Sequence, residues 1–175
     1  MREIRAELPR DLPIVERNVV RLVVRDSEDR ILLFHACEIT APELGEWWEL
    51  PGGGIEGGET CLEAALRELR EETGIAASAA QVGPPIWRRT ASFRHRQFRH
   101  LQHEVVVEVK LAGPGSVIDE SGRLDYEKED YFDFHWWPVA EVVTSQDRFY
   151  PGRLPALLAR FLAGDEIDEP FELWS

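Results

Sequence analysis

The sequence of 175 residues has few cysteines, fewer bases than acids and no long apolar segment. Its two cysteines, Cys37 and Cys61, lack metal-ligand spacing, so we expect reduced thiols. The 33 acidic and 20 basic residues give a formal net charge of −13, which disfavours non-specific binding to nucleic acids and anionic membranes. No apolar run could span a bilayer, and residues 1–18 lack the apolar region of a signal peptide. We therefore expect a cytoplasmic protein with neither a membrane nor nucleic acid as its partner. The sequence leaves open whether it forms a homodimer.

Apolar periodicity and turn residues divide the chain into elements. Runs rich in branched residues at 16–26 and 30–38, joined by a polar turn, predict a β-hairpin. The other predicted elements are strands at 46–54 (ending in a glycine loop), 75–93 (interrupted at 83–85), 102–111 and 132–137, a helical turn at 138–143, and helices at 60–74 and 150–165. Residues 112–130 are predicted to be a loop whose length suggests function. Strands around a central helix, in one domain over 1–175, predict an α/β sandwich around a mixed sheet.

The segment 60–74 carries the clearest helix signals. Thr60 and Glu63 have capping-box spacing, and Gly74 stands where a helix commonly ends on glycine. One predicted face is apolar, and the adjacent face carries three acids, Glu68, Glu71 and Glu72. Like charges four residues apart cost about 0.2–0.5 kcal/mol on an exposed helix. From the helix alone, a solvated acidic face and a cation site both remain open.

The residues before the helix favour a cation site. A glycine-rich loop, residues 50–60, leads into the helix N-terminus, where backbone groups can approach a ligand closely. Read in full, the stretch is Gly53, five residues, Glu59, seven residues, and then the sequence RELREETGI from Arg67. This resembles the Nudix box, GX5EX7REUXEEXGU with U apolar, at every specified position. The resemblance extends over about 15–162, leaving a C-terminal tail at about 165–175 without a predicted structure.

The resemblance implies a Nudix fold, an α/β/α sandwich around a mixed sheet. It also implies hydrolysis of a diphosphate bond in a nucleoside diphosphate linked to another moiety, with Mg²⁺ as cofactor and Mn²⁺ as a substitute. The implied metal ligands are Glu68, Glu71, Glu72 and the carbonyl of Gly52, and Glu68 and Glu71 also count as catalytic candidates. Four further residues of the motif, Gly53, Glu59, Arg67 and Gly74, are assigned to structure. Mg²⁺ prefers such oxygen ligands and usually joins carboxylates to substrate phosphates.

Many relatives use a further glutamate, on a loop outside the box, as base or extra ligand. The loop at 112–130 offers Glu127, Glu129 and Glu120. Glu127 lies nine residues before Trp136, the offset common in relatives with a similar tryptophan pair. We therefore predict Glu127 as this acid and Glu129 as second choice, with an ordinary solvated acidic loop as the alternative.

Substrate contacts are expected in the arginine-rich segment 87–100. Arginine binds phosphate through two hydrogen bonds and can stack on a base. We predict Arg88, Arg94 and Arg96 as substrate ligands, with ordinary surface charge or an RNA patch as alternatives. Trp47 is predicted to stack on a base, although a core role is equally compatible with the sequence. The histidines, His95 among them, lack zinc-ligand spacing and are not expected to bind metal.

Two other functions fit the same fold. One is a nucleotide sensor that does not cleave its ligand, which the intact box disfavours because a pure binder need not retain every acid. The other is a diphosphate isomerase of the isoprenoid type, and Cys37 lacks the sequence context of the active-site cysteine in that family. The sequence does not identify the substrate, since the segment after the box shows neither an ADP-ribose nor a dinucleoside-polyphosphate signature.

Overall fold

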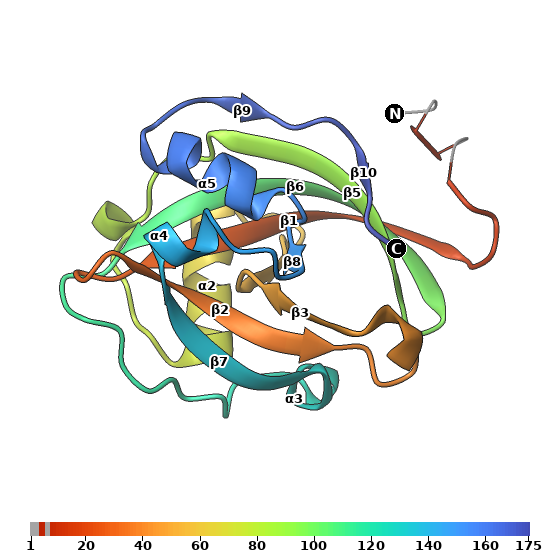
Figure 1. Cartoon of the computed structure of the whole chain (residues 1–175), viewed down its shortest axis with the longest axis horizontal. Coiled ribbons are helices and arrows are strands. Elements are labelled where there is room, and N and C mark those ends of the chain that lie inside the picture. Colours follow the sequence, from red (N-terminus) through yellow and green to blue (C-terminus); the bar gives the residue numbers. More distant parts are fainter. Residues whose placement is uncertain (1–3, 6–7) are drawn as a thin grey trace.

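A mixed sheet of ten strands runs through the computed structural model, which describes residues 4–5 and 8–175 (Figure 1). The strands are β1 (Ile14–Arg25), β2 (Arg30–Cys37), β3 (Glu46–Glu49), β4 (Gly52–Gly54), β5 (Trp87–His95), β6 (Phe98–Lys110), β7 (Tyr131–Pro138), β8 (Phe149–Tyr150), β9 (Ile167–Asp168) and β10 (Glu172–Leu173). Their order is β10-β5-β6-β1-β2-β3-β8, with β4 beside β1, β7 beside β2 and β9 beside β5. The predicted hairpin is the antiparallel pair β1–β2.

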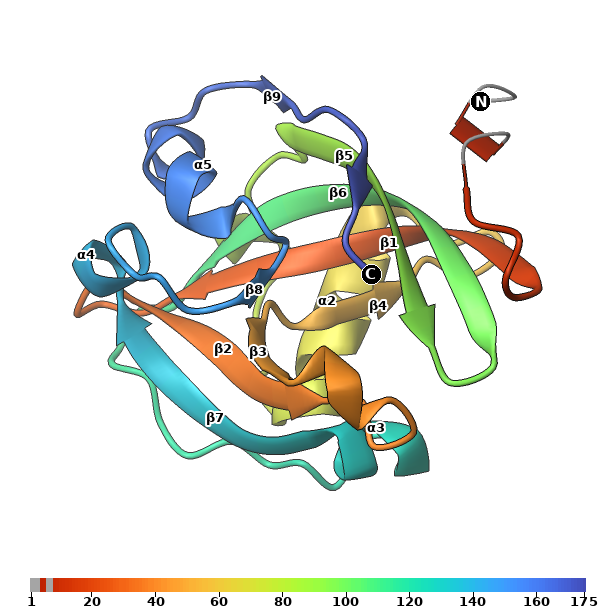
Figure 2. The ribbon, with the colours of Figure 1, turned by 45° about the vertical axis from the view of Figure 1, so that its right-hand side comes forward.

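Helices cover both faces of this sheet (Figures 1 and 2). Helix α2 (Cys61–Thr73) packs on one face, and α4 (Val139–Val142) with α5 (Leu154–Leu162) packs on the other. Two short 3-10 helices, η1 (Pro42–Leu44) and η2 (Ala79–Gln81), lie in connections. The predicted α/β/α sandwich around a mixed sheet is therefore confirmed.

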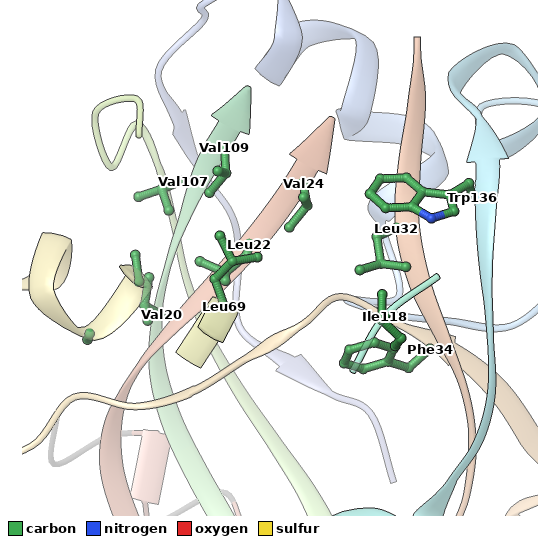
Figure 3. Close-up of a cluster of buried hydrophobic side chains, with 12 residues drawn as sticks. Val20, Leu22, Val24, Leu32, Phe34, Leu69, Val107, Val109, Ile118 and Trp136 are labelled. Carbon is green, nitrogen blue, oxygen red and sulfur yellow. The ribbon is translucent and has the colours of Figure 1, made fainter. Parts of the chain in front are cut away.

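Alternation along the strands divides the core into two layers. Val20, Leu22 and Val24 of β1 face α2, whereas Val23 faces α5. Figure 3 shows the first layer, in which Leu69 of α2 packs against β1 and β6 beneath it. Because α2 is fixed by this buried face, its acidic face has one defined direction.

Three segments differ from the prediction. The strand predicted at 75–93 begins only at Trp87, after η2. The predicted loop at 112–130 ends in a helix, α3 (Asp125–Asp130), which is too short to show a periodic apolar pattern. The C-terminal segment, for which no structure was predicted, adds β9 and β10 to the edge of β5. Each of these two strands has only two residues, so their pairing depends on β5 and not on local sequence.

Candidate active site

Helix α2 begins and ends where its sequence signals place it. The Thr60 hydroxyl accepts a hydrogen bond from the Glu63 backbone N–H, and the Glu63 carboxylate accepts one from the Thr60 N–H at 2.8 Å. At the other end Gly74 adopts φ 72°, a left-handed conformation that favours glycine. These caps confirm the predicted helix limits.

Strand β4 brings the glycine loop against the acidic face of α2. A side chain at Gly53 would place its Cβ 2.4 Å from the Glu68 carboxylate. Gly52 has φ 133°, and a Cβ there would lie 2.1 Å from the Val20 carbonyl oxygen. Gly52 therefore requires glycine, whereas a side chain at Gly53 would displace the Glu68 carboxylate from its place beside β4.

Arg67 joins this helix to the loop before it. Its guanidinium donates to both Glu59 carboxylate oxygens, at 2.8 and 2.9 Å, and to the Gly54 carbonyl at 2.8 Å. It also donates to Glu68 at 2.8 Å and to Glu71 at 3.1 Å. One cation is therefore shared among three carboxylates, two of which belong to the predicted metal ligands.

Glu72 and Glu68 are buried, while the Glu71 side chain is half exposed. The Glu72 Oε2 accepts a hydrogen bond from the Gly52 N–H at 2.7 Å, but its buried Oε1 has no hydrogen-bond partner among the described residues. Burial, reinforced by the charges of Glu68 and Glu127, raises the pKa of Glu72 well above its usual range. Burial also raises the pKa of Glu68, with partial compensation by Arg67.

Helix α3 brings Glu127 to the same site. Glu127 lines the cleft beside Glu68 and Glu71, and its charge contributes to the raised pKa of both Glu68 and Glu72. Its carboxylate accepts hydrogen bonds from the Leu124 N–H at 2.8 Å and the Tyr126 hydroxyl at 3.3 Å. The other two candidates have different partners. Glu129 pairs with Arg96 at 2.9 Å and Glu120 pairs with Arg123 at 3.2 Å.

Three of these acids, Glu68, Glu71 and Glu127, line a cleft of about 490 Å³, whereas the buried Glu72 does not line it. The cleft is also lined by Trp47, Phe93 and two arginines of β1, Arg17 and Arg21. The Trp47 Nε1–H donates to Glu49 at 2.9 Å, which fixes its ring at the cleft wall. The sequence did not single out Arg17, although its spacing of four from Arg21 along one strand places both side chains on the same face.

The predicted arginine ligands do not converge on this cleft. Arg88 lines a separate pocket of about 310 Å³, which its buried neighbour Arg89 also lines. Arg94 lies 3.6 Å from Glu43, and Arg96 pairs with two acids of α3. Two other arginines of the segment, Arg89 and Arg99, are buried in ion pairs with Glu104 and Asp11. Much of the basic segment therefore serves the fold.

A cluster of one histidine and two acids lies at the edge of the cleft. Ligand atoms of Glu38, His95 and Asp130 all lie within 4.8 Å of one another, an arrangement that could hold a metal ion. Sequence spacing could not indicate it, because the three residues come from different segments. Here His95 Nε2 lies 2.9 Å from Asp130 and 3.4 Å from Glu38, so these groups already serve as each other's partners.

Comparison with known proteins identifies the family. The NUDIX domain matches residues 15–159, most of the chain. The chain therefore belongs to the Nudix family of hydrolases, as its box predicted.

Both cysteines are free, and within the described residues no helix has the length and apolar character needed to cross a membrane.

Three curated relatives are RNA pyrophosphohydrolases. That of Halorhodospira halophila is 30% identical over 158 residues, covering 83% of this chain and 82% of that protein. That of Alkalilimnicola ehrlichii is 34% identical over 63% of this chain and 66% of its own length. That of Erythrobacter litoralis is 53% identical over 29% of this chain and 30% of its own length. The chain thus spans less than two thirds of two of these relatives.

Solved structures show the same fold. The MutT protein from Methanosarcina mazei Go1 has a TM-score of 0.59 at 16% identity, over 89% of this chain and 98% of that chain. An Ap4A hydrolase of C. elegans has a TM-score of 0.54 at 18% identity, over 85% of this chain and 98% of that chain. At these identities the likeness concerns the arrangement of sheet and helices.

Proposed function

We propose that this protein is a divalent-metal-dependent pyrophosphohydrolase that cleaves the diphosphate bond of a nucleotide. One observation carries the proposal. Glu72 is almost fully buried, and its Oε1 has no hydrogen-bond partner among the described residues. The charges of Glu68 and Glu127 raise its pKa further, and the opposing influence of Arg21 ranks below both. A buried carboxylate in such surroundings is costly to ionise unless it coordinates a metal.

The residues present fit Mg²⁺ or Mn²⁺. Both cations prefer oxygen ligands, and the site offers the carboxylates of Glu68, Glu71 and Glu72. Gly52, whose N–H donates to Glu72 at 2.7 Å, lies next to them, and its carbonyl is the further proposed ligand. When bound, the metal would neutralise these acids, polarise the phosphoryl group and lower the pKa of a coordinated water. Arg67 alone cannot do so, because its five donors are already shared with Glu59, Glu68, Glu71 and a carbonyl.

Glu127 is the proposed general base. It belongs to α3 and lines the cleft together with Glu68 and Glu71, and its charge contributes to the raised pKa of Glu68 and Glu72. In the proposed reaction Glu127 accepts a proton from water as the water oxygen bonds to phosphorus. The bridging P–O bond then breaks, and its electron pair leaves on the departing phosphate oxygen. Glu68 and Glu71 are the alternative bases.

The rest of the cleft suits a nucleotide. Trp47 and Phe93 offer aromatic faces for a base, and Arg17 and Arg21 offer positive charge for phosphates. Arg21 is already paired with Glu49 and Glu104, so Arg17 is the better candidate for direct contact. The named relatives suggest one substrate class to include, the 5′-phosphorylated end of RNA. A net charge of −13 argues against long contacts with an RNA chain, but the cleft needs to hold only its end.

The test is a substrate panel with the purified protein and millimolar Mg²⁺. It contains 5′-triphosphorylated RNA, ADP-ribose, oxidised dNTPs, dinucleoside polyphosphates and nucleotide sugars, with released phosphate, pyrophosphate and mononucleotide as readouts. We expect Mg²⁺-dependent turnover of at least one class, which EDTA and Glu72→Gln abolish. Tight binding of a nucleotide without turnover, under every metal tested, would contradict the proposal.

A further inference from the structure

Helix α3, which carries Glu127, has little apolar anchorage. It is six residues long, and Asp130 is its only buried residue. The neighbouring Leu124 is 57% exposed, and Tyr126 within the helix is 37% exposed. A helix this short has no stability of its own, so contacts with other segments must decide its position.

The turn between β5 and β6 supplies those contacts. His95 Nε2 lies 2.9 Å from the Asp130 carboxylate, and the Arg96 guanidinium lies 2.9 Å from Glu129 and 3.5 Å from Asp130. The Tyr126 ring packs edge-on against His95 at 5.7 Å, with the Arg96 guanidinium 5.9 Å from its centre. Two adjacent turn residues thus contact three residues of α3, on both sides of Glu127.

The turn itself is held in an unusual conformation. Arg96 has φ 55°, in the left-handed region that residues other than glycine rarely occupy. Its backbone N–H donates to the Glu38 carboxylate at 3.1 Å, and the same carboxylate lies 3.4 Å from His95. Glu38 is buried and also accepts hydrogen bonds from Thr40. Such a conformation persists only when its surroundings fix it, and it commonly marks functional positions.

We propose that His95 and Arg96 form a clamp that positions α3, and through it Glu127, over the acid cluster. Arg96 is then a positioning residue and not a ligand of the substrate. This proposal rests on the proposed role of Glu127. It follows from three features together. Helix α3 has little apolar anchorage, its last two acids, Glu129 and Asp130, pair with one turn, and that turn is anchored on buried Glu38.

Arg96→Gly is the sharpest variant, because glycine adopts φ 55° freely and the turn keeps its shape while both ion pairs are lost. We expect kcat to fall by roughly 10- to 100-fold, the effect of a catalytic group displaced by about 1 Å, while KM changes less than about 2-fold. Asp130→Asn, which removes the charge on the other side of the contact, should reproduce this split. Arg160→Ala, which breaks an exposed ion pair on α5, is the matched control. A large rise in KM for Arg96→Gly, with kcat preserved and Asp130→Asn normal, would show a substrate ligand and overturn the clamp.

Hydrogen exchange of the α3 amides gives a readout independent of catalysis. In Arg96→Gly, amides of 125–130 should exchange faster, while those of α2 stay at the wild-type rate. The double variant Arg96→Gly/Glu127→Gln should be no slower in turnover than Glu127→Gln alone, because both changes act on one group. If Glu127→Gln is fully active, the role of Glu127 is wrong, yet faster exchange in Arg96→Gly would still support the clamp. Unchanged exchange at 125–130 would overturn it.

Discussion

Two groups of buried carboxylates lie on either side of β1, and the protein treats them in opposite ways. Glu104 of β6 accepts hydrogen bonds from Arg21, Arg89 and Tyr150. Burial would raise its pKa, but the two arginines hold the pKa of Glu104 below its usual range. Glu72 of α2 is equally buried and lies beside further carboxylates, which together with burial raise its pKa.

The two clusters differ in whether the protein's own arginines supply the positive charge. Around Glu104 the chain supplies it, since Arg89 also lies beside Glu169 and Glu172 and so ties the C-terminal strands to β5 and β6. Around Glu72 the opposing influence of Arg21 ranks below burial and the charges of Glu68 and Glu127, and Arg67 is shared among Glu59, Glu68 and Glu71. The first cluster is therefore complete as folded and holds the sheet together. The second is incomplete as folded, and a bound cation would complete it.

The largest effect should follow from neutralising Glu72. Glu72→Gln removes a proposed metal ligand, so kcat should fall roughly 10³-fold or more. This loss is at least as large as the loss of kcat that follows removal of one main electrostatic contact in an active site. The same variant should unfold at a higher temperature in metal-free buffer, because it removes a buried charge that raises the cost of folding. Steady-state kinetics and thermal unfolding check the two halves. Wild-type kcat at saturating Mg²⁺ would remove α2 as the metal site.

The next largest effect concerns the base. Glu127→Gln should lower kcat by roughly 10²–10⁴-fold, the usual contribution of general-base catalysis. KM and the Mg²⁺ midpoint should move little, since glutamine keeps the shape of the side chain. A rise in the Mg²⁺ midpoint together with the loss of kcat would instead show that Glu127 is a metal ligand.

Glu129→Gln is the comparison for that experiment. It removes only an exposed ion pair, so kcat should fall no more than about 5-fold. If Glu129→Gln is crippled while Glu127→Gln is near normal, the base lies two residues further along the chain. If both are near normal, the base belongs to α2, with Glu68 and Glu71 as the first residues to test.

In the cluster around Glu104, where the arginines pair with the acids, the same substitution should lower the stability of the protein. Glu104→Gln leaves Arg21 and Arg89 buried without their main partner, so the free energy of unfolding should fall by about 3–5 kcal/mol. Chemical denaturation of this variant and of Glu72→Gln, both in metal-free buffer, compares the same substitution in the two clusters. Equal and same-signed effects would remove the distinction between them.

A smaller effect on stability should appear at acidic pH, through His100. Burial, with the charges of Arg17, His95 and Arg21, lowers the pKa of His100 from 6.5 to about 4. Between these values the unfolded chain binds a proton that the native protein does not, so stability should decrease as the pH falls from 6.5 to 4. The decrease is about 2 kcal/mol after solvent screening. His100→Gln should lose this component of the pH dependence, measured by urea unfolding. An unchanged slope would contradict the assignment.

The two clusters also differ in how far sequence could predict them. The proposed metal ligands lie on one continuous stretch, so the box, the capping residues and Gly74 could be recognised from local spacing. The cluster around Glu104 could not, because Arg89 meets Glu172, 83 residues further along, and Arg21 meets Glu104, also 83 residues further along. For the same reason Arg88, Arg94 and Arg96 were predicted as substrate ligands on charge alone. Their partners, or the pocket they line, become visible only in the fold.

A divalent cation is proposed to complete the acid cluster of α2. Thermal unfolding under Mg²⁺ and Mn²⁺ titration, for wild type and Glu72→Gln in parallel, tests it most directly. Wild type should be stabilised by RT ln(1 + [cation]/Kd), which is about 2.7 kcal/mol when the cation reaches about 100 times its Kd. Glu72→Gln should start from a higher melting temperature and gain much less. A wild-type melting temperature that does not change across the titration, or an equal gain in the variant, would contradict the claim.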